Sequence, residues 1–121
     1  MFAEPFHISI GCGLSIKKEL LEFFEQVVSK IKAAQIPCII DADGLNLLAK
    51  KNISLPETTI LTPHPKEMAR LMDCELEEIL SQPEICVQKC AEKYNAITIL
   101  KQHETMIYDK NNGLSINNTG N

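Results

Sequence analysis

Four short segments of the sequence carry the side chains best suited to chemistry. They are residues 11–13, 41–46, 62–67 and 101–105, and each lies at or just after the end of a stretch that is typical of a β-strand. In an open α/β sheet, ligands bind outside the carboxyl ends of the strands. If the strands are parallel neighbours, these segments meet at one edge of the sheet, and a ligand would bind there.

His64 is the most suggestive side chain in these segments. Pro63 and Pro65 flank it and fix the backbone just before a helical pattern, whose free N–H groups favour an anion. An imidazole held at such a place can donate a hydrogen bond to a phosphate or a carbonyl group. The sequence leaves this role and a helix-capping role for His64 equally open.

The other candidates each have a structural explanation as well as a functional one. Gly11 and Gly13 permit close approach of the backbone to a ligand, but a tight strand-to-helix turn needs them equally. Asp41 and Asp43 could hold a metal or orient a hydroxyl group, although turn and capping roles are favoured. Lys101 follows a strand and is either a surface lysine or a phosphate contact.

The spacing of apolar residues predicts the elements that position these segments. Strands that alternate with helices require right-handed crossovers, which predicts an α/β fold with a mostly parallel sheet and helices on both faces. Short loops between the last strands predict an antiparallel hairpin near the C-terminus. The predicted strands are 7–10, 38–41, 59–62, 96–100, 105–108 and 114–116, and the predicted helices are 15–35, 45–51, 65–72, 75–81 and 83–95.

Composition limits the class of protein. The 121 residues, 45% apolar and 23% charged, fit one soluble domain or part of one. A net charge of -4 with interleaved signs argues against a nucleic-acid partner. The apolar runs are too short for a membrane span and no secretory signal precedes them, so we expect a cytoplasmic protein. The five cysteines form no CxxC pair, which favours buried, reduced thiols over disulfides or a metal site.

Taken together, the segments resemble the NAD(P)H-hydrate dehydratase family, a branch of the ribokinase-like superfamily. Residues 41–49 begin with Asp-Ala-Asp-Gly-Leu-Asn, and residues 60–71 contain Thr-Pro-His-Pro. Residues 11–14 look like the start of the family's Gly-Pro-Gly-Leu-Gly turn, and residues 100–105 look like its Lys-Gly-Ala-His/Gly-Thr segment. The resemblance runs through nearly all of the chain in the family's order.

The resemblance implies a repair enzyme that dehydrates the S form of hydrated NADH or NADPH while ADP or ATP is hydrolysed. The hydroxyl group of the hydrate would be phosphorylated and then lost as phosphate, with Mg²⁺ accompanying the nucleotide. Gly13 and His64 match family positions that contact the hydrated nucleotide, and Asp43 and Asn46 match positions expected at the rim of the site. The positions that match the adenine-nucleotide segment are Lys101, Gln102, His103, Glu104 and Thr105.

The resemblance also implies that residues 1–121 form only part of a ribokinase-like domain. The family's Gly-Gly-Thr/Ser-Gly-Asp segment supplies anion-binding amides and the catalytic Asp, and it would follow Asn121. We therefore expect no catalytic residue and no protein-held metal in these 121 residues, and no activity from them alone. Apolar sheet edges in such a part leave association of copies open.

Two alternatives remain open at this point. A ribokinase-like kinase acting on a vitamin precursor would share the fold, but it should lack the combination of the Asp-Ala-Asp-Gly-Leu-Asn and Thr-Pro-His-Pro motifs. A non-catalytic remnant would bind a nucleotide or a partner chain without turnover.

Overall fold

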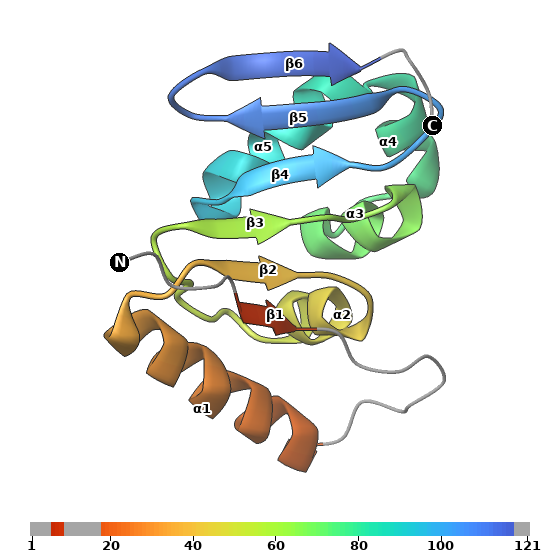
Figure 1. Cartoon of the computed structure of the whole chain (residues 1–121). Coiled ribbons are helices and arrows are strands. Elements are labelled where there is room, and N and C mark those ends of the chain that lie inside the picture. The colour runs from red at the N-terminus through yellow and green to blue at the C-terminus, as the bar shows by residue number, and fades with distance from the viewer. Residues whose placement is uncertain (1–5, 9–17, 118–121) are drawn as a thin grey trace.

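The structure is a computed structural model that describes residues 6–8 and 18–117, and it contains a six-stranded sheet in the order β1-β2-β3-β4-β5-β6 (Figure 1). Strands β1 to β4 are parallel, and β5 and β6 continue the sheet as an antiparallel hairpin. The predicted α/β class, the mostly parallel sheet and the hairpin are confirmed. The strands are β1 (Phe6–Ile8), β2 (Cys38–Ile40), β3 (Thr59–Leu61), β4 (Ile97–Leu100), β5 (Thr105–Asp109) and β6 (Gly113–Asn117), and the helices are α1 (Lys18–Ala34), α2 (Asp43–Lys50), α3 (Pro65–Met72), α4 (Leu76–Ser81) and α5 (Pro83–Tyr94).

The helices form where the sequence places their apolar stripes and end signals. In α1 the buried side chains are Phe24, Val28 and Ile31, which follow the predicted spacing of three to four residues. Helix α5 begins at Pro83, as predicted, and ends at Tyr94, with Asn95 as a left-handed cap at φ 51°. The start predicted for α1 at residue 15 lies outside the described residues.

The described helices cover one face of the sheet. Strands that follow chain order with right-handed crossovers place every connecting helix on the same side. Figure 1 shows α2 to α5 behind the sheet and α1 beside its β1 edge, and all five helices contribute side chains to one core. The described residues therefore supply one of the two helical layers that we expected. The isoleucines of the opposite face, Ile39, Ile60, Ile97, Ile99 and Ile107, are only partly buried.

The cysteines in the described residues are free thiols. Cys38, Cys86 and Cys90 are buried and Cys74 is partly buried, as the sequence predicts. Burial raises the pKa of the Cys38 thiol to about 11 and that of Cys90 to about 12, so both remain protonated at neutral pH. Among residues 6–8 and 18–117, no helix has the length and hydropathy that crossing a bilayer requires.

Candidate functional site

The segments that follow β2, β3 and β4 lie side by side at the carboxyl edge of the sheet. The Thr62 amide donates to the Ile40 carbonyl oxygen at 3.2 Å, and the Lys101 amide donates to the Pro63 carbonyl oxygen at 2.9 Å. These bonds continue the strand pairing past the strand ends, so three of the four predicted segments meet at one edge. The fourth segment, residues 11–13 with Gly13, lies outside the described residues.

The turn between β2 and α2 contains a strained alanine. Ala42 has φ 51° and ψ -133°, a combination that glycine adopts readily and that costs other residues about 1–3 kcal/mol. Gly44 is buried inside α2, so Ala42 rather than the nearby glycine takes the positive φ of this turn. The Gly44 and Leu45 amides donate to the carbonyl oxygens of Asp41 and Ala42, both at 3.0 Å, and hold this geometry.

Asp43, the first residue of α2, is held by a chain of polar contacts. Its Oδ1 accepts from Asn46 Nδ2 at 2.9 Å, and Asn46 Oδ1 accepts from Arg70 Nη1 on α3 at 3.1 Å. The other carboxylate oxygen, Oδ2, is buried without a hydrogen-bond partner among the described residues. The contacts therefore fix the carboxylate from one side. Sequence reasoning missed Arg70, because its partner on α2 lies 24 positions away.

His64 caps the N-terminus of α3. Its Nδ1 accepts from the Glu67 amide at 3.4 Å, while Glu67 Oε1 accepts from the His64 amide at 3.0 Å. This reciprocal pair is a capping box, so the capping role that the sequence left open is confirmed. Because Nδ1 accepts a hydrogen bond, the neutral ring carries its proton on Nε2, which lies 3.4 Å from Glu67 Oε2.

The imidazole of His64 is nevertheless available to a ligand. Its side chain is 47% exposed, whereas that of Glu67 is 9% exposed. A buried carboxylate and two prolines therefore hold an exposed ring at the carboxyl edge. The hydrogen bonds between Glu67 and His64 therefore orient the His64 ring.

The segment between β4 and β5 presents the predicted nucleotide-binding residues. Lys101 and His103 are exposed, and Gln102 and Glu104 are partly buried. Thr105 opens β5 and pairs with Asn117 of β6. No ion pair joins Lys101 to another described residue, so its ammonium group can pair with an anion. Within the same part of the chain, no group of three or more His, Cys, Asp or Glu side chains is placed to hold a metal ion.

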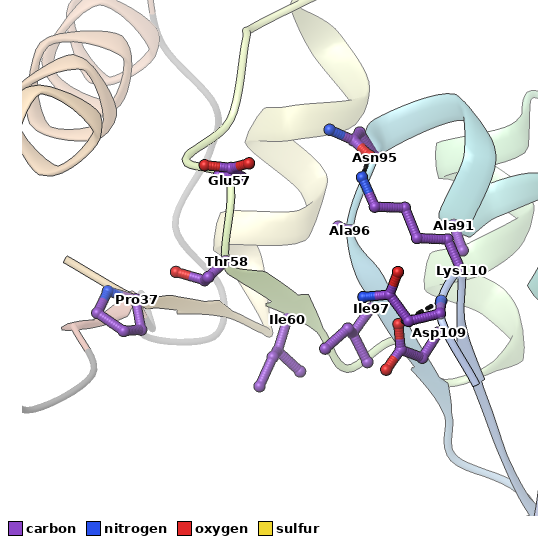
Figure 2. A pocket seen from close by; sticks show the side chains of 11 residues that line it. Pro37, Glu57, Thr58, Ile60, Ala91, Asn95, Ala96, Ile97, Asp109 and Lys110 are labelled. Atoms are coloured by element: carbon purple, nitrogen blue, oxygen red, sulfur yellow. Dashed lines mark hydrogen bonds between the residues drawn. The ribbon is translucent and has the colours of Figure 1, made fainter. Parts of the chain in front are cut away.

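A separate cavity lies at the opposite, amino end of the parallel strands (Figure 2). It has a volume of about 230 Å³, and Ile60 and Ile97 form an apolar wall on which both side chains point the same way. Lys110 Nζ donates to Asn95 Oδ1 at 3.0 Å on its rim. None of the predicted site residues lines this cavity, so it is distinct from the carboxyl edge.

Comparison with known proteins agrees with the motifs. A sequence model of the NAD(P)H-hydrate dehydratase family matches residues 7–121. The chain is 39% identical over 105 residues to the ADP-dependent (S)-NAD(P)H-hydrate dehydratase of Streptococcus thermophilus. The aligned region covers 84% of this chain and 36% of that protein.

Solved structures confirm the ribokinase-like fold. A ribokinase-like superfamily protein from Enterococcus faecalis V583 superposes with a TM-score of 0.74 at 26% identity, covering 95% of this chain and 39% of that one. The ADP/ATP-dependent NAD(P)H-hydrate dehydratase of Bacillus subtilis, co-crystallised with ATP and Mg²⁺, gives a TM-score of 0.73 at 30% identity with the same coverage, 95% and 39%. The chain spans only 20% to 22% of the first bifunctional NAD(P)H-hydrate repair enzymes that it matches.

Proposed function

The chain belongs to the NAD(P)H-hydrate dehydratase family, and we propose that it recognises hydrated NAD(P)H and an adenine nucleotide at the carboxyl edge of its sheet. The reaction would be dehydration of the S form of the hydrate, coupled to hydrolysis of ADP or ATP. The observation that carries the proposal is the family match over residues 7–121, whose motif segments after β2, β3 and β4 meet at that edge. These substrates are soluble nucleotides, which fits a cytoplasmic location.

We assign the contact with the hydrated nucleotide to His64 and Gly13. The support for His64 is its exposed ring, whose Nε2–H, 3.4 Å from Glu67 Oε2, can be shared with a phosphate or carboxamide oxygen of the ligand. The capping box keeps that donor in place before any ligand arrives, which lowers the entropy lost on binding. Gly13 is assigned only from its match to the family motif, because it lies outside the described residues.

We assign the adenine nucleotide to residues 101–105. The exposed Lys101 ammonium group is suited to a phosphate, and its backbone is fixed by the bond to Pro63. The described residues do not fit a protein-held metal, so Mg²⁺ would arrive on the phosphates of the nucleotide. Asp43 and Asn46 would form the rim on the α2 side, where their mutual hydrogen bond orients the carboxylate.

Binding without turnover is the outcome that we expect from the 121 residues. They contain no Gly-Gly-Thr/Ser-Gly-Asp segment, which the family uses to stabilise the transferred phosphoryl group and to deprotonate the hydroxyl group. Positioning alone does not replace a general base and an anion-binding site. Recovery of dihydronicotinamide absorbance from hydrated NADH with ADP or ATP should be absent, and a steady rate would refute this expectation.

Calorimetric titration with NADPH and with ADP tests the binding function. His64→Asn keeps a side chain that caps helices well but removes the imidazole, so stability should change little. We expect NADPH affinity to fall at least about tenfold while ADP affinity is retained. His64→Ala is the matched variant that also removes the cap and should cost about 1 kcal/mol of stability. If neither ligand binds the unaltered chain at about 1 mM, the proposal is wrong.

A further inference from the structure

A groove lies between α2 and α3, beside the proposed site. The two helices pack against each other (Figure 1), and the groove has a volume of about 470 Å³. Three of its residues lie three and four positions apart and so share one face of α2, and two come from the end of α3. The lining residues are Asn46, Ala49, Lys50, Arg70 and Asp73. Because Ala49 ends in a methyl group, the longer side chains around it leave room for a ligand.

The two cations of this groove have no acidic partner. Arg70 and Lys50 are exposed, and no ion pair joins either of them to another residue in the described part of the chain. The Arg70 guanidinium donates from Nη1 to Asn46 Oδ1 at 3.1 Å. That bond holds one arm of the planar group and leaves its other N–H donors for a ligand. Two such cations are suited to an anion that offers several oxygen atoms.

The usual structural role of a basic residue at the end of a helix is already filled in α3. Basic side chains in a last helical turn often bond the free carbonyl groups there. In α3 the Asp73 amide donates to the carbonyl oxygens of Ala69 and Arg70. The Leu71 carbonyl oxygen accepts from Lys93 Nζ of α5 at 2.7 Å. The Arg70 guanidinium is therefore bonded across the groove to α2 and is not needed at the end of its own helix.

The groove adjoins the residues that we assign to the hydrated nucleotide. Asn46 lines the groove and also donates to Asp43 Oδ1 at 2.9 Å, on the proposed rim. His64 caps α3, and Arg70 follows it by six positions, roughly 9 Å along the helix axis. A dinucleotide can span this distance, because a pyrophosphate bridge separates its two ribose rings. A ligand that contacts His64 can therefore place a second charged group in the groove.

We propose that this groove binds the 2′-phosphate of hydrated NADPH and makes the chain prefer NADPH to NADH. The inference rests on the proposed function, in which hydrated NAD(P)H binds at the carboxyl edge. A phosphate monoester carries a charge of about -1.5 to -2 at neutral pH, which two cations can balance. Arg70 bonds two of its oxygens, and Lys50 adds the second positive charge. The Asp73 carboxylate accepts from the neighbouring 3′-hydroxyl group of the same ribose.

Calorimetric titration of the 121-residue chain with NADPH and with NADH separates this inference from the proposed function. We expect NADPH to bind at least about tenfold more tightly, because NADH has a neutral hydroxyl group at the 2′ position. Equal affinities would overturn the inference and leave the proposed site intact. If neither dinucleotide nor ADP binds, the proposed function is wrong and this inference fails with it.

Arg70→Gln separates phosphate binding from the structural contact with Asn46. The variant should lose at least about tenfold in affinity for NADPH and keep its affinities for NADH and ADP within about twofold. Arg70→Lys keeps the charge without the planar group, so its preference for NADPH should be intermediate. A mere loss of the Asn46 contact would weaken both dinucleotides alike, and an equal loss in Arg70→Gln would therefore contradict the inference.

Two lysine variants complete the test, with circular dichroism to show that each variant is folded. Lys50→Gln should lower NADPH affinity by about threefold, since a single exposed charge contributes less than a bidentate pair. Lys89→Gln is the matched control, because Lys89 is an exposed lysine of α5 that does not line the groove. It should leave NADPH affinity unchanged. If Lys89→Gln lowers NADPH affinity as much as Arg70→Gln does, or if Arg70→Gln and Lys50→Gln both have no effect, the groove is not the phosphate site.

Discussion

The two ends of the parallel strands differ in what they offer a ligand. At the amino end, the strands open on a cavity of about 230 Å³ with an isoleucine wall, and the lysine on its rim is already bonded to Asn95. At the carboxyl end, the exposed groups of His64 and Lys101 stand on backbone segments that hydrogen bonds and prolines hold in place. None of the predicted site residues lines the amino-end cavity. The proposed site is instead built from polar groups that are held in place at the carboxyl ends of the strands.

Two lysines at opposite ends of the strands test this contrast most directly. Lys101 follows β4 at the carboxyl end, Lys110 follows β5 at the amino end, and both are exposed. Lys101→Ala should lower ADP affinity by about 1.5–3 kcal/mol, roughly ten- to hundredfold, because it removes a charged donor from a phosphate. Lys110→Ala should leave ADP affinity unchanged in the same calorimetric titration. Loss of ADP binding in Lys110→Ala but not in Lys101→Ala would move the site to the amino end.

The sequence predicts the elements of both ends well, because these depend on local patterns. Apolar spacing placed the described strands and helices to within a few residues, and the predicted range 83–95 placed the α5 start at Pro83. Polar segments after the strands indicated the carboxyl edge, since topology alone brings the ends of neighbouring parallel strands together.

The details of the site depend on tertiary packing and were not predictable in this way. Arg70 on α3 donates a hydrogen bond to Asn46 on α2, 24 positions earlier, and no local sequence pattern predicts a contact between residues that far apart. The burial of Glu67 beneath His64 follows from how α3 packs on its neighbours. The positive φ falls on Ala42 because Gly44 is taken into α2, and residue preferences alone favour the opposite assignment.

The loss of folding stability at alkaline pH tests how well the amino end of the strands excludes water. Cys38 opens β2 there, and burial raises the pKa of its thiol from an ordinary value of 9.0 to about 11. The unfolded chain releases this proton near pH 9 while the folded chain keeps it. The stabilisation is therefore complete below pH 9 and is lost as pH rises through 11. By pH 10 the loss from this group should be about 1.4 kcal/mol.

Urea unfolding of Cys38→Ala and of the unaltered chain at pH 8 and pH 10 measures how much of the stability lost at alkaline pH comes from the Cys38 thiol. The substitution lowers stability at both pH values because it removes a buried side chain. The decrease between the two pH values should be smaller in the variant by about 1.4 kcal/mol. An equal decrease in both proteins would mean that water reaches the amino end as freely as the carboxyl end, and the contrast between the ends would fail.

Two of the four described non-glycine residues with positive φ, Ala42 and Asn95, allow the backbone strain at the two ends to be compared. Ala42 at the carboxyl end combines φ 51° with ψ -133°, whereas Asn95 at the amino end has φ 51° and ψ 50°, an ordinary left-handed conformation that asparagine tolerates. Ala42→Gly should stabilise the chain by about 1 kcal/mol in urea unfolding, because relief of strain outweighs the entropy that glycine loses on folding. Asn95→Gly should change stability by no more than about 0.5 kcal/mol, since no strain is relieved there. A gain at Asn95 that equals or exceeds the gain at Ala42 would show that strain is not concentrated at the carboxyl edge, and the turn between Asp41 and Asp43 would then be an ordinary connection.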